Sequence, residues 1–144
     1  MRKQAWLAMV GMLVAGVVGV AQSDEIANAE GFDAAMKDVG KNFGAVRSGM
    51  EARDGAAVTS GTENLVAIFE RVEAFFEARE LEAGITAAGE AKQAASDIVS
   101  ALENQAFDQL AGARDRLGGT CRSCHTEYRE EIEGGGYRFK DGVL

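Results

Sequence analysis

The 144-residue chain contains no proline, two cysteines, one histidine and few aromatic residues. Proline is the residue that breaks helices most strongly, so its absence removes the main obstacle to long helices. The plentiful Ala, Glu, Lys and Leu favour helices as well. The two cysteines and one histidine together are too few for a structural zinc site, which needs four ligands. The chain is also poor in basic residues, with 15 Lys and Arg against 23 Asp and Glu. The formal charge of −8 disfavours nucleic acids and anionic membrane surfaces as partners.

The N-terminus carries the pattern of a secretory signal peptide. Arg2 and Lys3 precede a stretch over 5–20 that is apolar apart from its glycines, and small residues up to Ala21 are followed by polar ones. We predict that residues 1–21 are cleaved and that residues 22–144 form a single periplasmic domain. The alternative is an uncleaved anchor, but an apolar run of about 16 residues is shorter than the roughly 20 that span a bilayer. We therefore expect no stable membrane insertion.

Four segments have the three- and four-residue apolar spacing of amphipathic helices. We expect these helices over 31–53, 62–79, 86–103 and 107–133, with a short tail after the glycines at 134–136. Asp54-Gly55 and Ser60-Gly61 mark the first turn, and Thr62 is the expected cap of the second helix. Four such helices with short connections predict an all-α fold, an antiparallel four-helix bundle with up-down-up-down topology.

Small residues recur on the expected inner faces of the last two helices. The third helix has an alanine-rich face, formed by Ala88, Ala91, Ala95, Ile98 and Leu102. Such a face permits close approach of another helix or of a flat prosthetic group. Gly118 and Gly119 interrupt the apolar stripe of the fourth helix and weaken it by about 1 kcal/mol each relative to Ala. They either relieve crowding beside such a group or mark a break in the helix.

Both cysteines and the one histidine lie in the five residues from Cys121 to His125. This C-x-x-C-H sequence is the attachment signature of a c-type haem. Two thiols three residues apart can form thioethers with the two vinyl groups of one porphyrin, and the adjacent imidazole can then bind the iron. We predict that Cys121 and Cys124 hold one covalent haem c beside the C-terminal helix, with His125 as the proximal axial ligand.

The alternatives for this motif are a redox dithiol and a plain disulfide between Cys121 and Cys124. A thioredoxin-like C-x-x-C requires a βαβ context, and nothing near the motif is patterned as a strand. A disulfide would leave the adjacent His125 unexplained. Export and haem attachment also support each other, because c-type haem is usually attached outside the cytoplasm.

The string from Cys121 to Arg129 resembles the motif of the class II c-type cytochromes, the cytochrome c′ family, in which an aromatic residue and an arginine follow C-x-x-C-H. The order of the four expected helices extends this resemblance over residues 22–144. It implies that Tyr128 packs on the porphyrin and that Arg129 lies beside the haem or holds a propionate. Core packing of Tyr128 and a surface ion pair between Arg129 and Glu133 remain open. Members of this family often form dimers through their first two helices, so a homodimer is a further expectation.

The segment from Met36 to Phe43 is similar to the Met-Lys-x-x-Gly stretch of low-spin family members, in which that Met is the distal iron ligand. The resemblance makes Met36 the candidate sixth ligand, although a Met on an apolar helix stripe is by spacing alone more often a core residue. Phe32 occupies the position at which many high-spin members carry an arginine. Phe43 and Phe69 are further candidates for the pocket lining.

The resemblance implies an electron carrier with His/Met ligation rather than an enzyme. Its partner would be a redox protein, and the acidic mature chain would fit a basic docking surface on that partner. The alternative is a five-coordinate protein that binds nitric oxide or carbon monoxide, with Met36 off the iron. A peroxidase-like enzyme usually needs a distal acid or base, and the only histidine is the proximal one.

Overall fold

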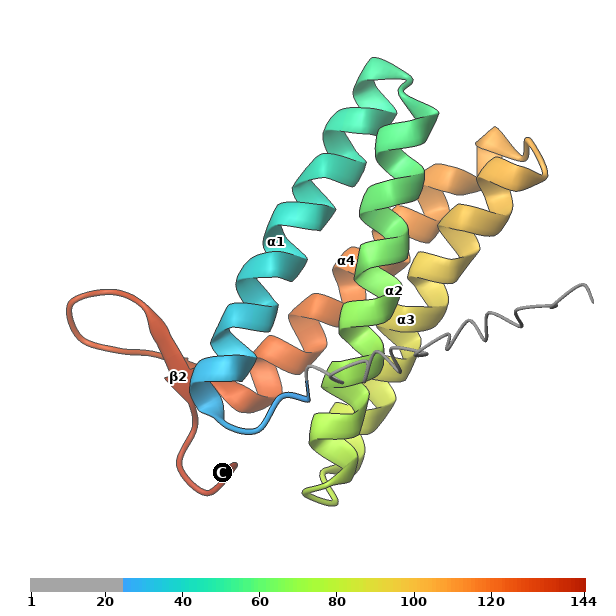
Figure 1. The fold of residues 1–144 in the computed structure, drawn as a ribbon. Coiled ribbons are helices and arrows are strands. Elements are labelled where there is room, and N and C mark those ends of the chain that lie inside the picture. Colours follow the sequence, from blue (N-terminus) through green and yellow to red (C-terminus); the bar gives the residue numbers. More distant parts are fainter. Residues whose placement is uncertain (1–24) are drawn as a thin grey trace, which may run out of the picture.

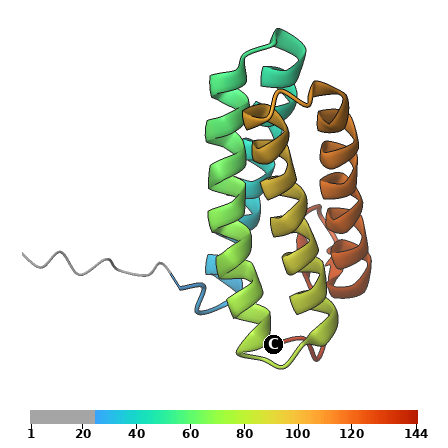
Figure 2. The same cartoon turned by 90° about the vertical axis from the view of Figure 1, so that its right-hand side faces the viewer.

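The computed structural model describes residues 25–144, so the predicted signal peptide lies outside the described residues. The chain forms four helices, α1 (Ala29–Ala52), α2 (Gly55–Glu77), α3 (Glu82–Glu103) and α4 (Phe107–Tyr128), followed by two short strands, β1 (Arg129–Glu131) and β2 (Tyr137–Phe139). Successive helices run antiparallel and pack on one another, α1 on α2, α2 on α3 and α3 on α4 (Figures 1 and 2). The predicted all-α, up-down-up-down four-helix bundle is confirmed.

The connection between α1 and α2 is shorter than the sequence predicted. The second helix begins at Gly55 rather than at Thr62, because Asp54 caps it by accepting a hydrogen bond from the Ala57 amide at 3.0 Å. Thr62, the expected cap, is buried inside the helix, and its hydroxyl donates to the carbonyl of Val58 at 2.6 Å.

Gly61 also lies inside α2, although the Ser60-Gly61 pair was expected to mark a turn. A Cβ atom added at Gly61 would lie 3.0 Å from a methyl group of Val46 and 3.2 Å from the carbonyl oxygen of Asn42, both on α1. The glycine therefore serves the close approach of two helices rather than a turn.

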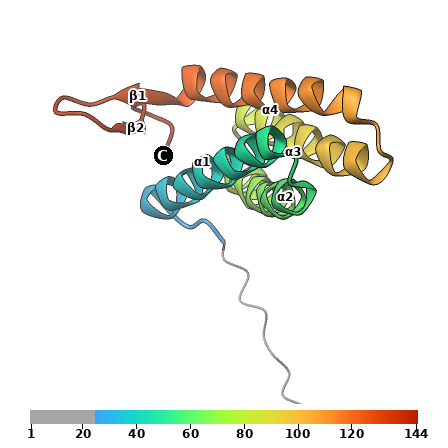
Figure 3. The same ribbon diagram turned by 90° about the horizontal axis from the view of Figure 1, so that it is seen from above.

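The fourth helix ends at Tyr128, five residues earlier than the predicted end at 133. The chain then forms an antiparallel hairpin in which Arg129 pairs with Phe139 and Glu131 with Tyr137. Gly134, Gly135 and Gly136 form its turn at φ values of 90°, 90° and 104°, which L residues rarely adopt. Seen from above, the hairpin extends beyond the end of α4 (Figure 3).

The hydrophobic core lies mainly between α2 and the helices on either side of it. Phe75, Phe76, Leu65, Ile98 and Leu117 are among the largest fully buried side chains. The alanine-rich face of α3 is confirmed, since Ala88, Ala91, Ala95 and Ile98 are buried, with Leu102 partly buried against them. α4 is continuous through Gly118 and Gly119, so these residues do not break the helix.

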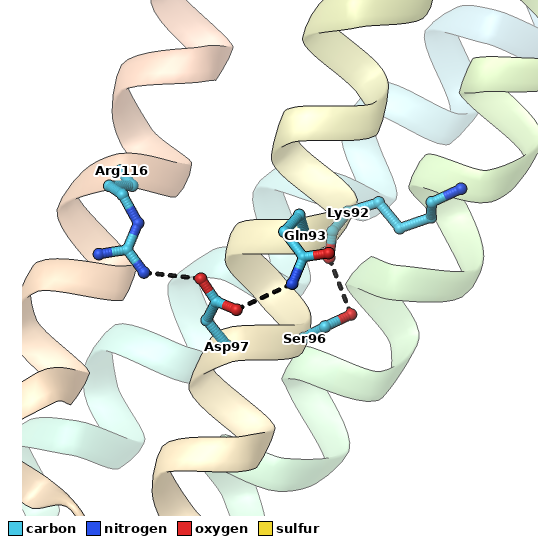
Figure 4. Close-up of polar contacts among 5 residues, drawn as sticks. All are labelled: Lys92, Gln93, Ser96, Asp97 and Arg116. Carbon is cyan, nitrogen blue, oxygen red and sulfur yellow. Dashed lines mark hydrogen bonds and ion pairs between the residues drawn. The ribbon is translucent and has the colours of Figure 1, made fainter.

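An ion pair on the surface joins α4 to α3. Arg116 donates to one carboxylate oxygen of Asp97 at 2.7 Å, and Gln93, one turn earlier on α3, donates to the other at 2.9 Å (Figure 4). Both hydrogen bonds favour the carboxylate form and lower the pKa of Asp97, with that from Gln93 contributing most.

Candidate cofactor site

The C-x-x-C-H motif lies in the last two turns of α4. Cys121 and Cys124 are free thiols, both partly buried and packed against the hydrophobic core. Residues three apart on a helix share a face, so the two sulfur atoms lie on the same side of α4. His125 is the next residue and is also partly buried.

Three cavities adjoin this motif. The main cavity, about 560 Å³, lies between the start of α1, the end of α4 and the segment from Tyr137 to Leu144. The inner cavity, about 290 Å³, is lined by residues of all four helices. The outer cavity, about 440 Å³, lies between α4 and the hairpin. His125 and Arg129 line all three, so the motif lies where the cavities meet.

Met36 reaches the same region from a different helix, α1. Its side chain, on α1, lines both the main and the inner cavity, as do Cys124 and His125 of α4. The structure therefore brings Met36 and the motif to shared cavities, although 84 residues separate Met36 from the first motif residue, Cys121. Iron ligation by Met36 stays a prediction.

The inner cavity has small residues on one side and aromatic residues on the other. Ala87, Ala88 and Ala91 of α3 line it, together with Gly118 of α4. Phe43 and Phe69, the predicted lining residues, also face this cavity. Phe32, which stands where many members of the resembled family carry an arginine, lines both the main and the inner cavity.

Burial changes the acid–base properties of the motif. It raises the pKa of Cys121, and it raises the pKa of Cys124 to about 11, with a further contribution from Cys121. Burial also lowers the pKa of His125, and the positive charge of Arg129 lowers it further. A neutral imidazole is the form that binds metals. The raised thiol pKa values disfavour the redox-dithiol alternative, because such motifs depend on a lowered pKa.

Tyr128 packs in the core and also lines a cavity. Its ring is buried against Phe76, with 5.2 Å between the ring centroids, and it also lines the main cavity. Core packing is thus observed, and contact with a porphyrin stays a prediction.

Arg129 is not paired with Glu133, the alternative that the sequence left open. Its guanidinium carbon lies 3.8 Å from the centroid of the Tyr137 ring, the distance of a cation–π contact. Contact with a haem propionate stays a prediction for this residue.

Sequence reasoning missed the contribution of the C-terminal hairpin. Tyr137, Phe139 and Lys140 line the main cavity, but the tail after the glycines was assigned no role. The alternation of aromatic and basic residues from Tyr137 to Lys140, directly after three glycines, is a strand signal that could have identified them.

Comparisons with protein-family models, with curated proteins and with solved structures find no match to this chain. Within residues 25–144, no cluster of three or more His, Cys, Asp and Glu side chains could hold a metal ion. No helix of the same region is both long and apolar enough to cross a bilayer.

Proposed function

We propose that this protein is a periplasmic electron carrier with one covalently attached c-type haem. The observation that supports this most strongly is that Met36 of α1 lines the same two cavities as Cys124 and His125 of α4. The C-x-x-C-H spacing indicates covalent haem attachment, and the cavities provide space for a cofactor beside the motif.

The residues present fit this group. The main and inner cavities lie within the roughly 300–1,000 Å³ range of cofactor sites when taken together. Alanines and phenylalanines on their walls suit a flat apolar macrocycle. Cys121 and Cys124 would hold it through thioethers, His125 would be the proximal ligand, and Met36 the distal one.

When bound, haem supplies a one-electron couple between ferrous and ferric iron. Met36 on α1 and His125 on α4 would hold the iron from separate helices of a packed bundle. Because neither side chain would have to move when an electron is gained or lost, little reorganisation would oppose electron transfer. Phe32, Phe43 and Phe69 would exclude water, and this apolar surrounding also affects the reduction potential.

The charge of the mature chain indicates the kind of partner. Cleavage after Ala21 removes Arg2 and Lys3, which leaves 13 basic and 23 acidic residues and a formal charge of −10. A redox protein with a basic docking surface would be attracted to this chain.

The test is the visible spectrum of the protein produced with haem-maturation machinery, oxidised and reduced, before and after addition of carbon monoxide. We expect a covalent haem with a low-spin spectrum that carbon monoxide does not change. Met36→Ala should convert it to a high-spin, carbon monoxide-binding form. Met50→Ala is the matched control, since Met50 is partly buried on the same helix but lines neither cavity.

Two results would contradict the proposal in different ways. A wild-type protein that is high-spin and binds carbon monoxide would place Met36 off the iron and favour the alternative function, binding of nitric oxide or carbon monoxide. A protein that carries no covalent haem would favour the disulfide-bonded helical bundle.

A further inference from the structure

One face of the C-terminal hairpin supplies most of its cavity-lining side chains. Successive strand residues point to opposite faces, so the pairings of Arg129 with Phe139 and of Glu131 with Tyr137 place these four residues on one face. Arg129 and Tyr137 are diagonal neighbours on that face, within reach of a long and an aromatic side chain. Glu130 and Arg138 lie on the other face, where they form an ion pair at 2.6 Å.

The hairpin is fixed to the bundle at its base, where β2 ends beside the end of α4. The ring of Phe139 lies 4.7 Å from that of Phe32 on α1 and 5.9 Å from that of Phe75 on α2, measured between centroids. The backbone amide of Lys140 donates to the carbonyl of Tyr128 at 2.9 Å. The Lys140 ammonium donates to the carbonyl of Thr126 at 2.7 Å. The hairpin can therefore hold a side chain in a defined place.

Tyr137 is poorly explained by packing. It is 57% exposed, whereas Phe139 two residues later belongs to the aromatic cluster of the core. Its ring lies beneath the guanidinium of Arg129. The contact with the Tyr137 ring thus limits the positions that the Arg129 guanidinium can take.

The charge of Arg129 is well placed to act on a bound group. The residue lines all three cavities, and its positive charge reaches both Cys124 and His125. Within residues 25–144, no acidic side chain forms an ion pair with Arg129 that would neutralise this charge.

We propose that Tyr137 is a positioning residue whose ring holds the Arg129 guanidinium at the wall of the cofactor cavities, where its charge raises the reduction potential of the bound haem. This inference rests on the proposed function. A nearby positive charge favours the reduced state, because reduction lowers the positive charge of the iron centre. The hairpin is thereby part of the redox site rather than a passive tail.

The test is the midpoint potential of the haem-loaded protein in four variants. Tyr137→Ala should lower the potential, since it releases the guanidinium to solvent, and Arg129→Gln should lower it at least as far. Tyr137→Phe should keep the wild-type value because it retains the ring. The double variant should match Arg129→Gln alone, since the effect of Tyr137 passes through Arg129.

A second readout does not depend on the redox couple. The NMR signal of the Arg129 Nε–H proton should carry an upfield ring-current shift that is lost in Tyr137→Ala and retained in Tyr137→Phe. Because Tyr137 is exposed, we expect thermal melts of both variants to match the wild type, so that altered folding does not explain the result.

An unchanged potential in Tyr137→Ala would overturn the inference, as would a shift that adds to that of Arg129→Gln. A fall in Tyr137→Phe equal to that in Tyr137→Ala would assign the effect to the hydroxyl group and also overturn it. These results are distinct from failure of the proposed function, in which the purified wild-type protein would contain no covalent haem or would be high-spin and bind carbon monoxide.

Discussion

Helices α2 and α4 are almost equal in length, at 23 and 22 residues, but they differ greatly in how much of them the protein buries. Nine residues of α2 are buried, and three of α4, namely Ala113, Leu117 and Tyr128. The apolar side of α2 is covered by side chains from both neighbouring helices. The corresponding side of the last two turns of α4 faces cavities.

This difference indicates what each helix depends on. Most helices in proteins are stabilised by packing of an apolar face rather than by intrinsic propensity. α2 obtains that packing from the side chains of neighbouring helices, whereas the last two turns of α4 do not. Gly118 and Gly119 weaken α4 further, because glycine has a low helix propensity. A prosthetic group attached through Cys121 and Cys124 would cover the face that the protein leaves open.

The largest effect is expected when that group is prevented from attaching. The double substitution Cys121→Ala and Cys124→Ala should abolish covalent haem and reduce stability by an amount comparable with loss of a large core side chain, about 2–5 kcal/mol. We expect hydrogen exchange, measured by mass spectrometry, to show lost protection in α4 while α2 retains most of its protection.

Ser123→Ala is the matched control for this substitution, since Ser123 lies between the two cysteines but is exposed. It should keep both the haem and the protection of α4. If the haem-free double variant melts cooperatively and α4 remains as protected as α2, α4 does not depend on the group and the comparison between the helices is wrong.

The helices were predictable because their apolar spacing is a local property, but three of their ends were not. α3 begins at Glu82, four residues before the expected start at 86. The start of α2 was misplaced because Gly61 is a turn signal in sequence and a helix-packing residue in space. The end of α4 was placed too late because Ile132 continues the apolar stripe of the helix. The hairpin that replaces the last turn depends on contact of Phe139 with Phe32, which lies 107 residues away.

A second prediction introduces the same small change, Gly to Ala, at a packed position of α3 and at an exposed position of α4. In Gly84→Ala the new Cβ atom would lie 2.4 Å from ring atoms of the fully buried Phe76. Overpacking of this kind costs about 1–3 kcal/mol. Nothing lies within 4 Å of a Cβ atom at Gly119, so Gly119→Ala should instead stabilise by about 0.5–1 kcal/mol through helix propensity.

Urea denaturation of the two variants and the wild type gives the comparison directly. Opposite signs support a tightly packed α2–α3 contact and an unhindered, exposed position at Gly119 on α4. A Gly84→Ala variant as stable as the wild type would show that Phe76 moves aside without cost, and the packed region would then be less rigid than its burial indicates.

The candidate site was predictable to the extent that its chemistry is local. Cys121, Cys124 and His125 were identified from five consecutive residues, and the structure places all three beside cavities. The position of Met36 at the same cavities depends on the packing of the bundle, and spacing alone did not distinguish it from a core residue. Tyr137 was missed because its partner, Arg129, reaches it only through the register of the hairpin.

The smallest effect is expected at the ion pair that joins α4 to the packed part of the bundle. Arg116→Ala removes the bond to Asp97 shown in Figure 4, and since both side chains are more than a third exposed the loss should be at most about 1 kcal/mol. The folded-state pKa of Asp97 is lowered, first by Gln93 and then by Arg116. Its contribution is therefore present above the unfolded-state pKa of about 3.9 and disappears as pH falls through the lower folded-state value.

Urea denaturation at pH 7 and near pH 2 checks this, with Arg114→Ala as the control because Arg114 pairs with Asp115, its neighbour on the same helix. Arg116→Ala should be less stable than wild type at pH 7 and nearly equal to it at the lower pH, and the difference at pH 7 should shrink in high salt. A loss of the same size at both pH values would assign it to packing of the arginine stem rather than to the Asp97 carboxylate. The attachment of α4 to α3 would then be apolar, and the weakness of α4 would be confined to the face that carries the motif.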